Sequence, residues 1–194
     1  MKNINDMALM KVKDERKRQN LLFLLDDIDS AYKREAYGAA FICCLILPYI
    51  CSSIDRNDGK QSADTDYIDW WNENISPLFK ADLVITKKKY AYHLSGAVGY
   101  ALRCHVLHAA NPKGSRILKE LKKYYSQIEG KNVNIKFHPT ASHFILLCSE
   151  IDEYTIDIEI SINRQIFTKK ILDMVLEKYL DIDWYKNRVI TYSK

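Results

Sequence analysis

The sequence predicts an α+β protein that is mainly α, with a helical bundle over residues 1–130 and a small antiparallel sheet plus a C-terminal helix over residues 131–194. Apolar residues recur three or four apart over residues 21–55, which is the period of an amphipathic helix. Residues 90–110 carry apolar groups on every side of a helical wheel, as expected for a helix at the centre of a bundle. Residues 156–162 instead alternate isoleucine with polar residues, which predicts a half-buried strand.

The first 130 residues should contain helices joined by polar linkers, namely residues 21–55, 67–79, 90–110 and 115–129. The first of these reads as one long helix or two broken ones. Side-chain oxygens at Asp64, Thr65 and Asp66 can accept from free backbone N–H groups, so they mark the start of the second. Thr86 is a candidate cap for the third helix, and Gly130 should stop the fourth.

The last third of the chain predicts a three-stranded antiparallel meander followed by a helix. The strands are expected over residues 133–138, 143–150 and 154–162, joined by the short turns PTAS and IDE. The helix over residues 166–180 has an apolar side that can cover this sheet while the domain packs on the bundle.

Composition is that of an ordinary globular protein. The chain has 194 residues and a net charge of +4, which permits an acidic partner without requiring one. Its five cysteines show no CxxC spacing, which favours a reducing cytoplasm over a disulfide framework or a zinc ribbon. The uncharged run Ala36–Ile54 approaches the length of a membrane span, but Pro48 interrupts it, so we expect a buried helix that kinks or ends there and no membrane partner.

A lone arginine draws attention to the third helix. Arg103 is the one permanent charge between Lys89 and Lys113, and burial of an unpaired guanidinium costs several kcal/mol. One interpretation is a structural salt bridge to an acidic residue of a neighbouring helix, for which the candidates are Glu35, Asp66, Asp69 and Glu73. The other is an anion site, for phosphate above all, because the guanidinium presents a planar fork of donors.

His108 follows Arg103 by five residues and also allows two interpretations. It can interact with the dipole at the end of a helix that Asn111 and Pro112 terminate, or it can transfer protons next to a bound phosphate. The run Arg103-Cys-His-Val-Leu-His108 is similar to the motif of the HEPN superfamily, an arginine and a histidine separated by four to six residues. These compact helical bundles include ribonuclease toxins, abortive-infection proteins and RNA-cleaving CRISPR effectors.

The resemblance covers residues 20–130 and implies a metal-independent endoribonuclease that needs no cofactor, either a toxin or a phage-defence effector. It implies that Arg103 holds the scissile phosphate and that His108 moves protons, while the RNA 2′-hydroxyl attacks and leaves a 2′,3′-cyclic phosphate. RNA is then the partner, with an antitoxin or another protein as a further one. The alternative is a non-catalytic helical module that binds a nucleotide or a protein through the same cleft.

One residue departs from the family pattern. HEPN ribonucleases usually have a polar residue directly after the arginine, and this chain has Cys104, for which His105 is a candidate substitute in substrate binding. Cys104 and His108 are also neighbours on a helix, so a metal site or a Cys/His nucleophile pair is a competing hypothesis that lacks further ligands. The cluster Lys87, Lys88 and Lys89 is a candidate RNA-binding surface, or simply a solvated one.

The same chemistry predicts a homodimer. Strand cleavage through the 2′-hydroxyl works best with both a base and an acid, and each motif supplies one histidine. On a straight helix Arg103 and His108 are separated by about 140° and about 7.5 Å, so two chains should complete one site. Gly96 and Gly99 are then expected to admit the helix of the second chain.

Overall fold

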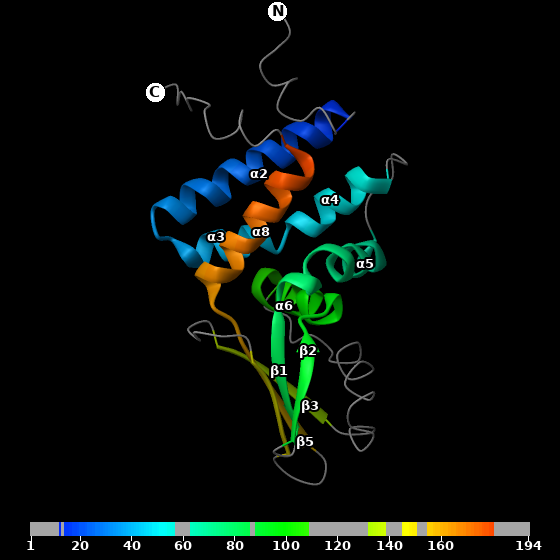
Figure 1. Ribbon diagram of the computed structural model, residues 1–194, viewed down its shortest axis with the longest axis vertical. Helices are drawn as coiled ribbons and strands as arrows, with labels where there is room; N and C mark the ends of the chain where they lie inside the picture. Colours follow the sequence, from blue (N-terminus) through cyan, green and yellow to red (C-terminus); the bar gives the residue numbers. More distant parts are fainter. Residues whose placement is uncertain are drawn as a thin grey trace, which may run out of the picture.

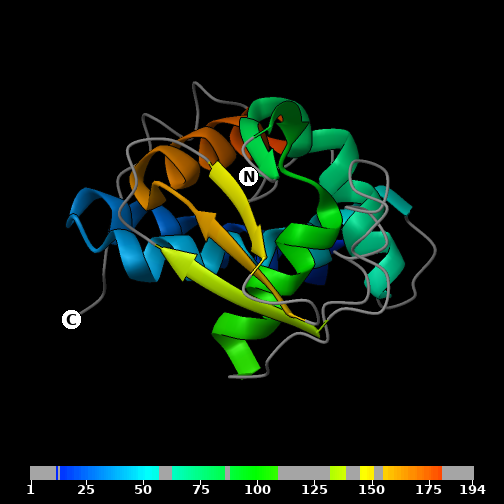
Figure 2. The ribbon, with the colours of Figure 1, turned by 90° about the horizontal axis from the view of Figure 1, so that it is seen from below.

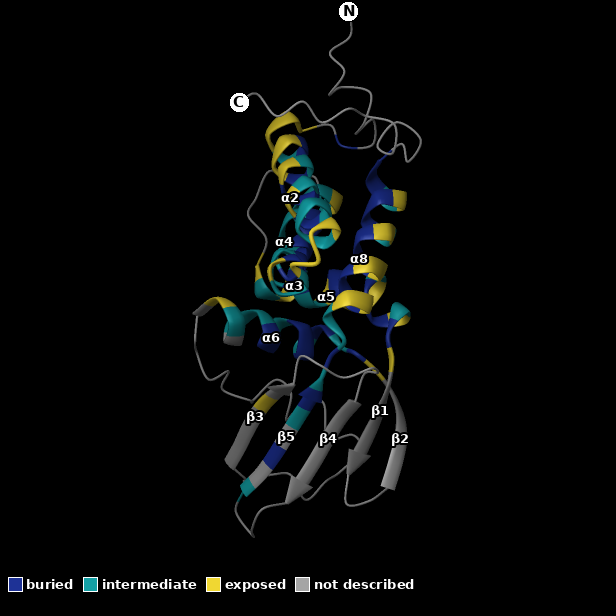
Figure 3. Cartoon of the chain, turned by 90° about the vertical axis from the view of Figure 1, so that its left-hand side faces the viewer, coloured by how far each residue is buried: buried dark blue, intermediate teal, exposed yellow. Residues whose placement is uncertain are grey.

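The computed structural model describes residues 12, 14–56, 63–85, 88–108, 132–138, 145–150 and 155–180. These residues are mainly helical, as predicted. Figure 1 shows a body of helices from which a mixed sheet extends, and Figure 3 shows α6 lying between the two. The helices are α2 (Glu15–Lys33), α3 (Tyr37–Cys44), α4 (Leu47–Arg56), α5 (Asp64–Asn74), α6 (Gly96–His108) and α8 (Arg164–Tyr179). The predicted helix over residues 115–129 lies outside the described residues.

Three helices occupy the segment predicted as one or two. The Asp14 side chain caps α2 by accepting from the Lys17 N–H at 3.1 Å, and α2 ends where Glu35 adopts a left-handed backbone with φ 60°. A turn separates α3 from α4, and Pro48 lies in the first turn of α4, where its missing N–H costs no hydrogen bond. The predicted break near Pro48 is therefore present, just before the proline.

The run Tyr37–Arg56 has the length and apolar composition of a membrane-spanning helix, the one such segment found in the described part of the chain. In this structure it is broken between α3 and α4, and it supplies Phe41, Cys44, Leu45 and Cys51 to the buried core.

The predicted helix over residues 90–110 is wrong in its first part. Residues before α6 form a hairpin of two strands, β1 (Lys80–Ile85) and β2 (Lys88–His93), and a 3-10 turn, η1 (Ser76–Leu78), leads into it from α5. The apolar and aromatic residues Leu83, Tyr90 and Tyr92 suit a strand as well as a helix, and the pairing partner decides between them.

The sheet also differs from a simple meander. Its order is β2-β1-β4-β5-β3, with the last strands being β3 (Asn132–His138), β4 (Ile145–Glu150) and β5 (Thr155–Ser161). β4 and β5 form the expected antiparallel pair, whereas β3 runs parallel to β5 on its outer side and does not adjoin β4. Figure 2 shows these three strands with α6 beside them.

The chain does not divide into a bundle and a separate sheet region at residue 130. β1 pairs in parallel with β4, so that Asp82 lies opposite Ile145 and the two halves share one sheet. α8 packs mainly against α3 and α2 rather than over the sheet. Its Phe167 ring stacks on Phe79 at 5.0 Å and contacts Phe41 and Trp71 at 5.0 and 5.9 Å, in one continuous core.

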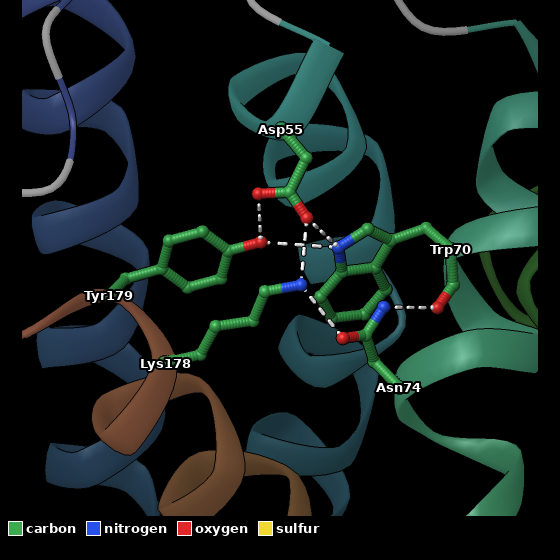
Figure 4. Close-up of polar contacts among 5 residues, drawn as sticks. All are labelled: Asp55, Trp70, Asn74, Lys178 and Tyr179. Carbon is green, nitrogen blue, oxygen red and sulfur yellow. Dashed lines mark hydrogen bonds and ion pairs between the residues drawn. The ribbon is translucent and has the colours of Figure 1, made fainter.

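A polar network fixes the C-terminal end of α8 to α4 and α5 (Figure 4). The Asp55 carboxylate accepts from Tyr179 Oη at 2.8 Å, from Lys178 Nζ at 2.8 Å and from Trp70 Nε1 at 3.0 Å. Lys178 Nζ also donates to Asn74 Oδ1 at 2.8 Å. Burial raises the pKa of the Tyr179 hydroxyl, with a further increase from Cys51 and Asp55, so it stays protonated and keeps donating.

Replacing Asp55 tests this network. Asp55→Asn removes the charge and turns an N–H₂ group toward donors, so we expect a loss of about 1–3 kcal/mol in the free energy of unfolding, measured by urea denaturation. Asp173→Asn is the matched control, because Asp173 pairs with Lys169 on the exposed surface of α8 and its loss should cost less than about 0.5 kcal/mol. Equal effects of the two variants would contradict the assignment.

Candidate functional site around Arg103

Close packing of α5 on α6 sets the position of the site. A Cβ atom at Gly99 would lie 2.5 Å from the Trp71 ring, and one at Gly96 would meet the backbone carbonyl of Ile68. Trp71 Nε1 donates to the Leu94 carbonyl at 2.8 Å, and the Gly96 N–H donates to Asn72 Oδ1 at 2.7 Å. Both glycines therefore admit α5 of the same chain, and the expectation that they admit a second copy of α6 is wrong.

Arg103 lies on α6 against an aromatic ring of α4. Its guanidinium carbon is 4.3 Å from the centre of the Tyr49 ring and 6.0 Å from that of Tyr100. The residue is half-buried, and its Nε atom is buried without a hydrogen-bond partner. A cation over an aromatic face is stabilised by the ring quadrupole, more strongly when water is partly excluded.

Arg103 does not form the salt bridge that one interpretation of the sequence predicts. Within the described part of the chain, no ion pair joins Arg103 to Glu35, Asp66, Asp69 or Glu73. Asp66 pairs with Arg56 and accepts from the Ala63 N–H at 2.6 Å, as a residue in the first turn of α5. The four predicted carboxylate partners are thus wrong, and the Tyr49 ring stabilises the charge of Arg103 instead.

Two hydroxyl groups beside Arg103 bond to a carboxylate at the start of α5. Tyr49 Oη donates to Asp64 Oδ1 at 2.9 Å, and Tyr100 also bonds to Asp64. Burial raises the pKa of Tyr49 and the Asp64 bond adds to the increase, whereas the positive charge of Arg103 lowers it. Burial likewise raises the pKa of Tyr100 above its ordinary range, with contributions from Asp64 and Cys104. Both hydroxyls remain protonated at neutral pH and act as donors.

The structure places the two histidines by backbone only. His105 lies on α6 two residues after Arg103, and His108 is the last described residue of α6. Their side chains lie outside the described residues, as do Asn111 and Pro112, so the proton-transfer and metal hypotheses for His108 stay predictions. In the part of the chain that is described, no group of three or more His, Cys, Asp or Glu residues could hold a metal ion.

The lysine run does not lie on the helix that carries Arg103. Lys88 and Lys89 begin β2, opposite Ile85 and Val84 of β1, and Lys87 is outside the described residues. β2 runs from these lysines toward α6, so they are at the end of the hairpin that is away from the helix (Figure 1). Six residues of strand span up to about 20 Å, which separates the lysines from the start of α6.

Sequence reasoning missed Tyr49, Tyr100 and Asp64. Tyr49 lies in an uncharged run that is typical of a buried helix, Tyr100 lies in a segment with apolar groups on every side of a helical wheel, and Asp64 indicates only the start of a helix. One signal was available for Tyr49. It is the first residue with a polar side-chain atom after four apolar ones, Leu45 to Pro48.

No family model, curated protein or solved structure matches the chain.

Substitution of Gly99 tests the packing that positions Arg103. Gly99→Ala places a methyl group into the Trp71 ring, so we expect a loss of about 1–3 kcal/mol in the free energy of unfolding. Gly38→Ala is the matched helical control, because its Cβ would meet only the end of the Arg164 side chain, and its effect should stay within about 1 kcal/mol. An unchanged urea midpoint for Gly99→Ala would contradict this packing.

Proposed function

We propose that the protein is a HEPN-like, metal-independent endoribonuclease acting in the cytoplasm as a toxin or phage-defence effector. The observation that supports this most is the state of Arg103, a half-buried arginine that is stacked on tyrosine and has no carboxylate partner among the described residues. A structural salt bridge would have used its donors, whereas a phosphate requires them.

Arg103 supplies the phosphate-binding group in this proposal. Its planar fork of N–H donors can contact two non-bridging oxygens of a phosphodiester and stabilise the charge that develops when the 2′-hydroxyl attacks phosphorus. The partly buried surroundings strengthen that interaction, because electrostatic attraction grows as water is excluded.

His108 supplies proton transfer. An imidazole titrates near neutral pH, so it can take a proton from the attacking 2′-hydroxyl or give one to the leaving 5′-oxygen. The bond from phosphorus to the 5′-oxygen breaks as the bond to the 2′-oxygen forms. The products are a 2′,3′-cyclic phosphate and a free 5′-hydroxyl.

RNA cleavage in the presence of EDTA tests the proposal. We expect the purified protein to cut RNA but not DNA, since DNA lacks the 2′-hydroxyl. We expect Arg103→Ala to lower the cleavage rate at least about 100-fold, the loss typical when an electrostatic donor to the transition state is removed. Arg103→Lys should recover little, because an ammonium group lacks the planar fork.

Arg164→Ala is the control for this experiment, because Arg164 is a half-buried arginine on α8 that lies against Gly38 rather than in the site. It should leave cleavage unchanged. Cleavage that requires an added metal ion, or that survives in a folded Arg103→Ala protein, would falsify the mechanism.

A homodimer with a composite site belongs to the same proposal. Its support is the need for two proton-transfer groups, because α5 occupies the glycine side of α6 and another surface must form the interface. An excess of His108→Ala subunits mixed with wild type should lower the activity below simple dilution, provided the chains exchange. A strictly monomeric and fully active protein in analytical ultracentrifugation would rule the composite site out.

The second candidate is a non-catalytic module that binds a nucleotide or a protein. Cys104 favours it, because this residue bonds to Tyr100, within the site, where the active family members usually carry a polar residue. Wild-type protein that binds RNA through Arg103 without cutting it would identify this function.

A further inference from the structure

The Tyr49 ring takes the place that a carboxylate would occupy beside a partly buried arginine. The Arg103 guanidinium carbon is 4.3 Å from the ring centre, and within the described residues no hydrogen bond or ion pair reaches this guanidinium. An aromatic face stabilises the charge without accepting from the N–H groups, which point outward in the guanidinium plane. A ring therefore fixes the position of the cation and leaves its donor edge unused.

We propose that Tyr49 is the positioning residue for Arg103, holding the guanidinium by its ring so that the N–H edge is free to receive a phosphate. This inference rests on the proposed function for its ligand, a phosphodiester, and adds a residue from a different helix to the site. Tyr49 itself does not touch the reacting atoms.

Two contacts and the preceding proline fix the ring. Pro48 restricts the backbone directly before it, and the hydroxyl donates to Asp64 at the first residue of α5. The Tyr49 ring also packs on the buried Tyr67 ring at 5.0 Å, and Tyr67 Oη in turn donates to the Leu45 carbonyl at 3.2 Å. α4 therefore carries the ring, α5 contacts it through Asp64 and Tyr67, and α6 brings Arg103 onto its face.

Three variants separate the ring from the hydroxyl and from general stability. Tyr49→Phe keeps the aromatic face and loses the bond to Asp64, whereas Tyr49→Leu loses both. Tyr37→Leu is the matched control, because Tyr37 is also half-buried on the adjoining α3 and its ring contacts Tyr32. Thermal unfolding is measured for all three, so that a loss of fold is recognised.

Steady-state cleavage of an RNA oligonucleotide should then distinguish them. We expect Tyr49→Leu to lower kcat about 10- to 100-fold with less than about a threefold change in KM, because a misplaced charge acts mainly on the transition state. Tyr49→Phe should stay within about threefold of wild type, and Tyr37→Leu should match wild type. Unchanged kcat in Tyr49→Leu, an equal loss in Tyr49→Phe, or an equal loss in Tyr37→Leu would each overturn the proposal.

A second measurement does not depend on cleavage. In nitrogen-15 spectra of arginine side chains, the Nε–H signal that Arg103→Lys removes should exchange slowly with water, because this atom is buried. Its exchange should accelerate at least about tenfold in Tyr49→Leu and stay slow in Tyr49→Phe. Slow exchange in Tyr49→Leu overturns the positioning role. If the wild type neither cuts nor binds RNA, the proposed function fails, and this signal still decides whether Tyr49 positions Arg103.

Discussion

The approach of α5 to α6 is the constraint on which the rest of the structure depends. The Trp71 ring packs against Gly99 and its Nε1 donates to the Leu94 carbonyl, which leaves no room for a side chain at position 99 of α6. The contact fixes both the distance and the rotation of α6. Tyr67, one turn before Trp71, consequently reaches Tyr49 and Tyr100, and Arg103, one turn beyond Gly99, arrives on the Tyr49 ring. Without the two glycines, the arginine could not occupy this position.

The environment of Arg103 separates charge stabilisation from hydrogen bonding. In a buried ion pair one carboxylate supplies both, and the arginine has little left to offer a ligand. Here the ring of Tyr49 supplies charge stabilisation without accepting hydrogen bonds. Asp64, a carboxylate that contacts the same tyrosines, binds their hydroxyl groups instead. Tyr49 therefore donates its hydroxyl hydrogen to the Asp64 carboxylate, while the face of its ring stabilises the Arg103 guanidinium.

Local patterns predicted the helices better than the sheet. The three- and four-residue spacing over residues 21–55, the acceptors at Asp64 and Asp66 and the alternation over residues 156–162 each depend on near neighbours, and each element is present. The local pattern over residues 80–93 does not predict β1 and β2, because β1 joins the sheet through β4, whose residues lie some sixty positions further along the chain. Arg103 stood out as the one charge in an apolar segment. Tyr49 did not, because only tertiary packing brings α4 beside it.

The parallel pairing of β1 with β4 has a consequence for the order in which the chain is made. β1 and β2 can form their hairpin as soon as residue 93 has left the ribosome, but the other edge of β1 has no strand to bind until residues 145–150 follow. An open strand edge is a place where two chains can join, and closing a loop of this length is slow. During synthesis the free edge of β1 must therefore be protected while more than fifty further residues are added. The helices completed by then, α2 to α6, are the part of the chain available to cover this edge.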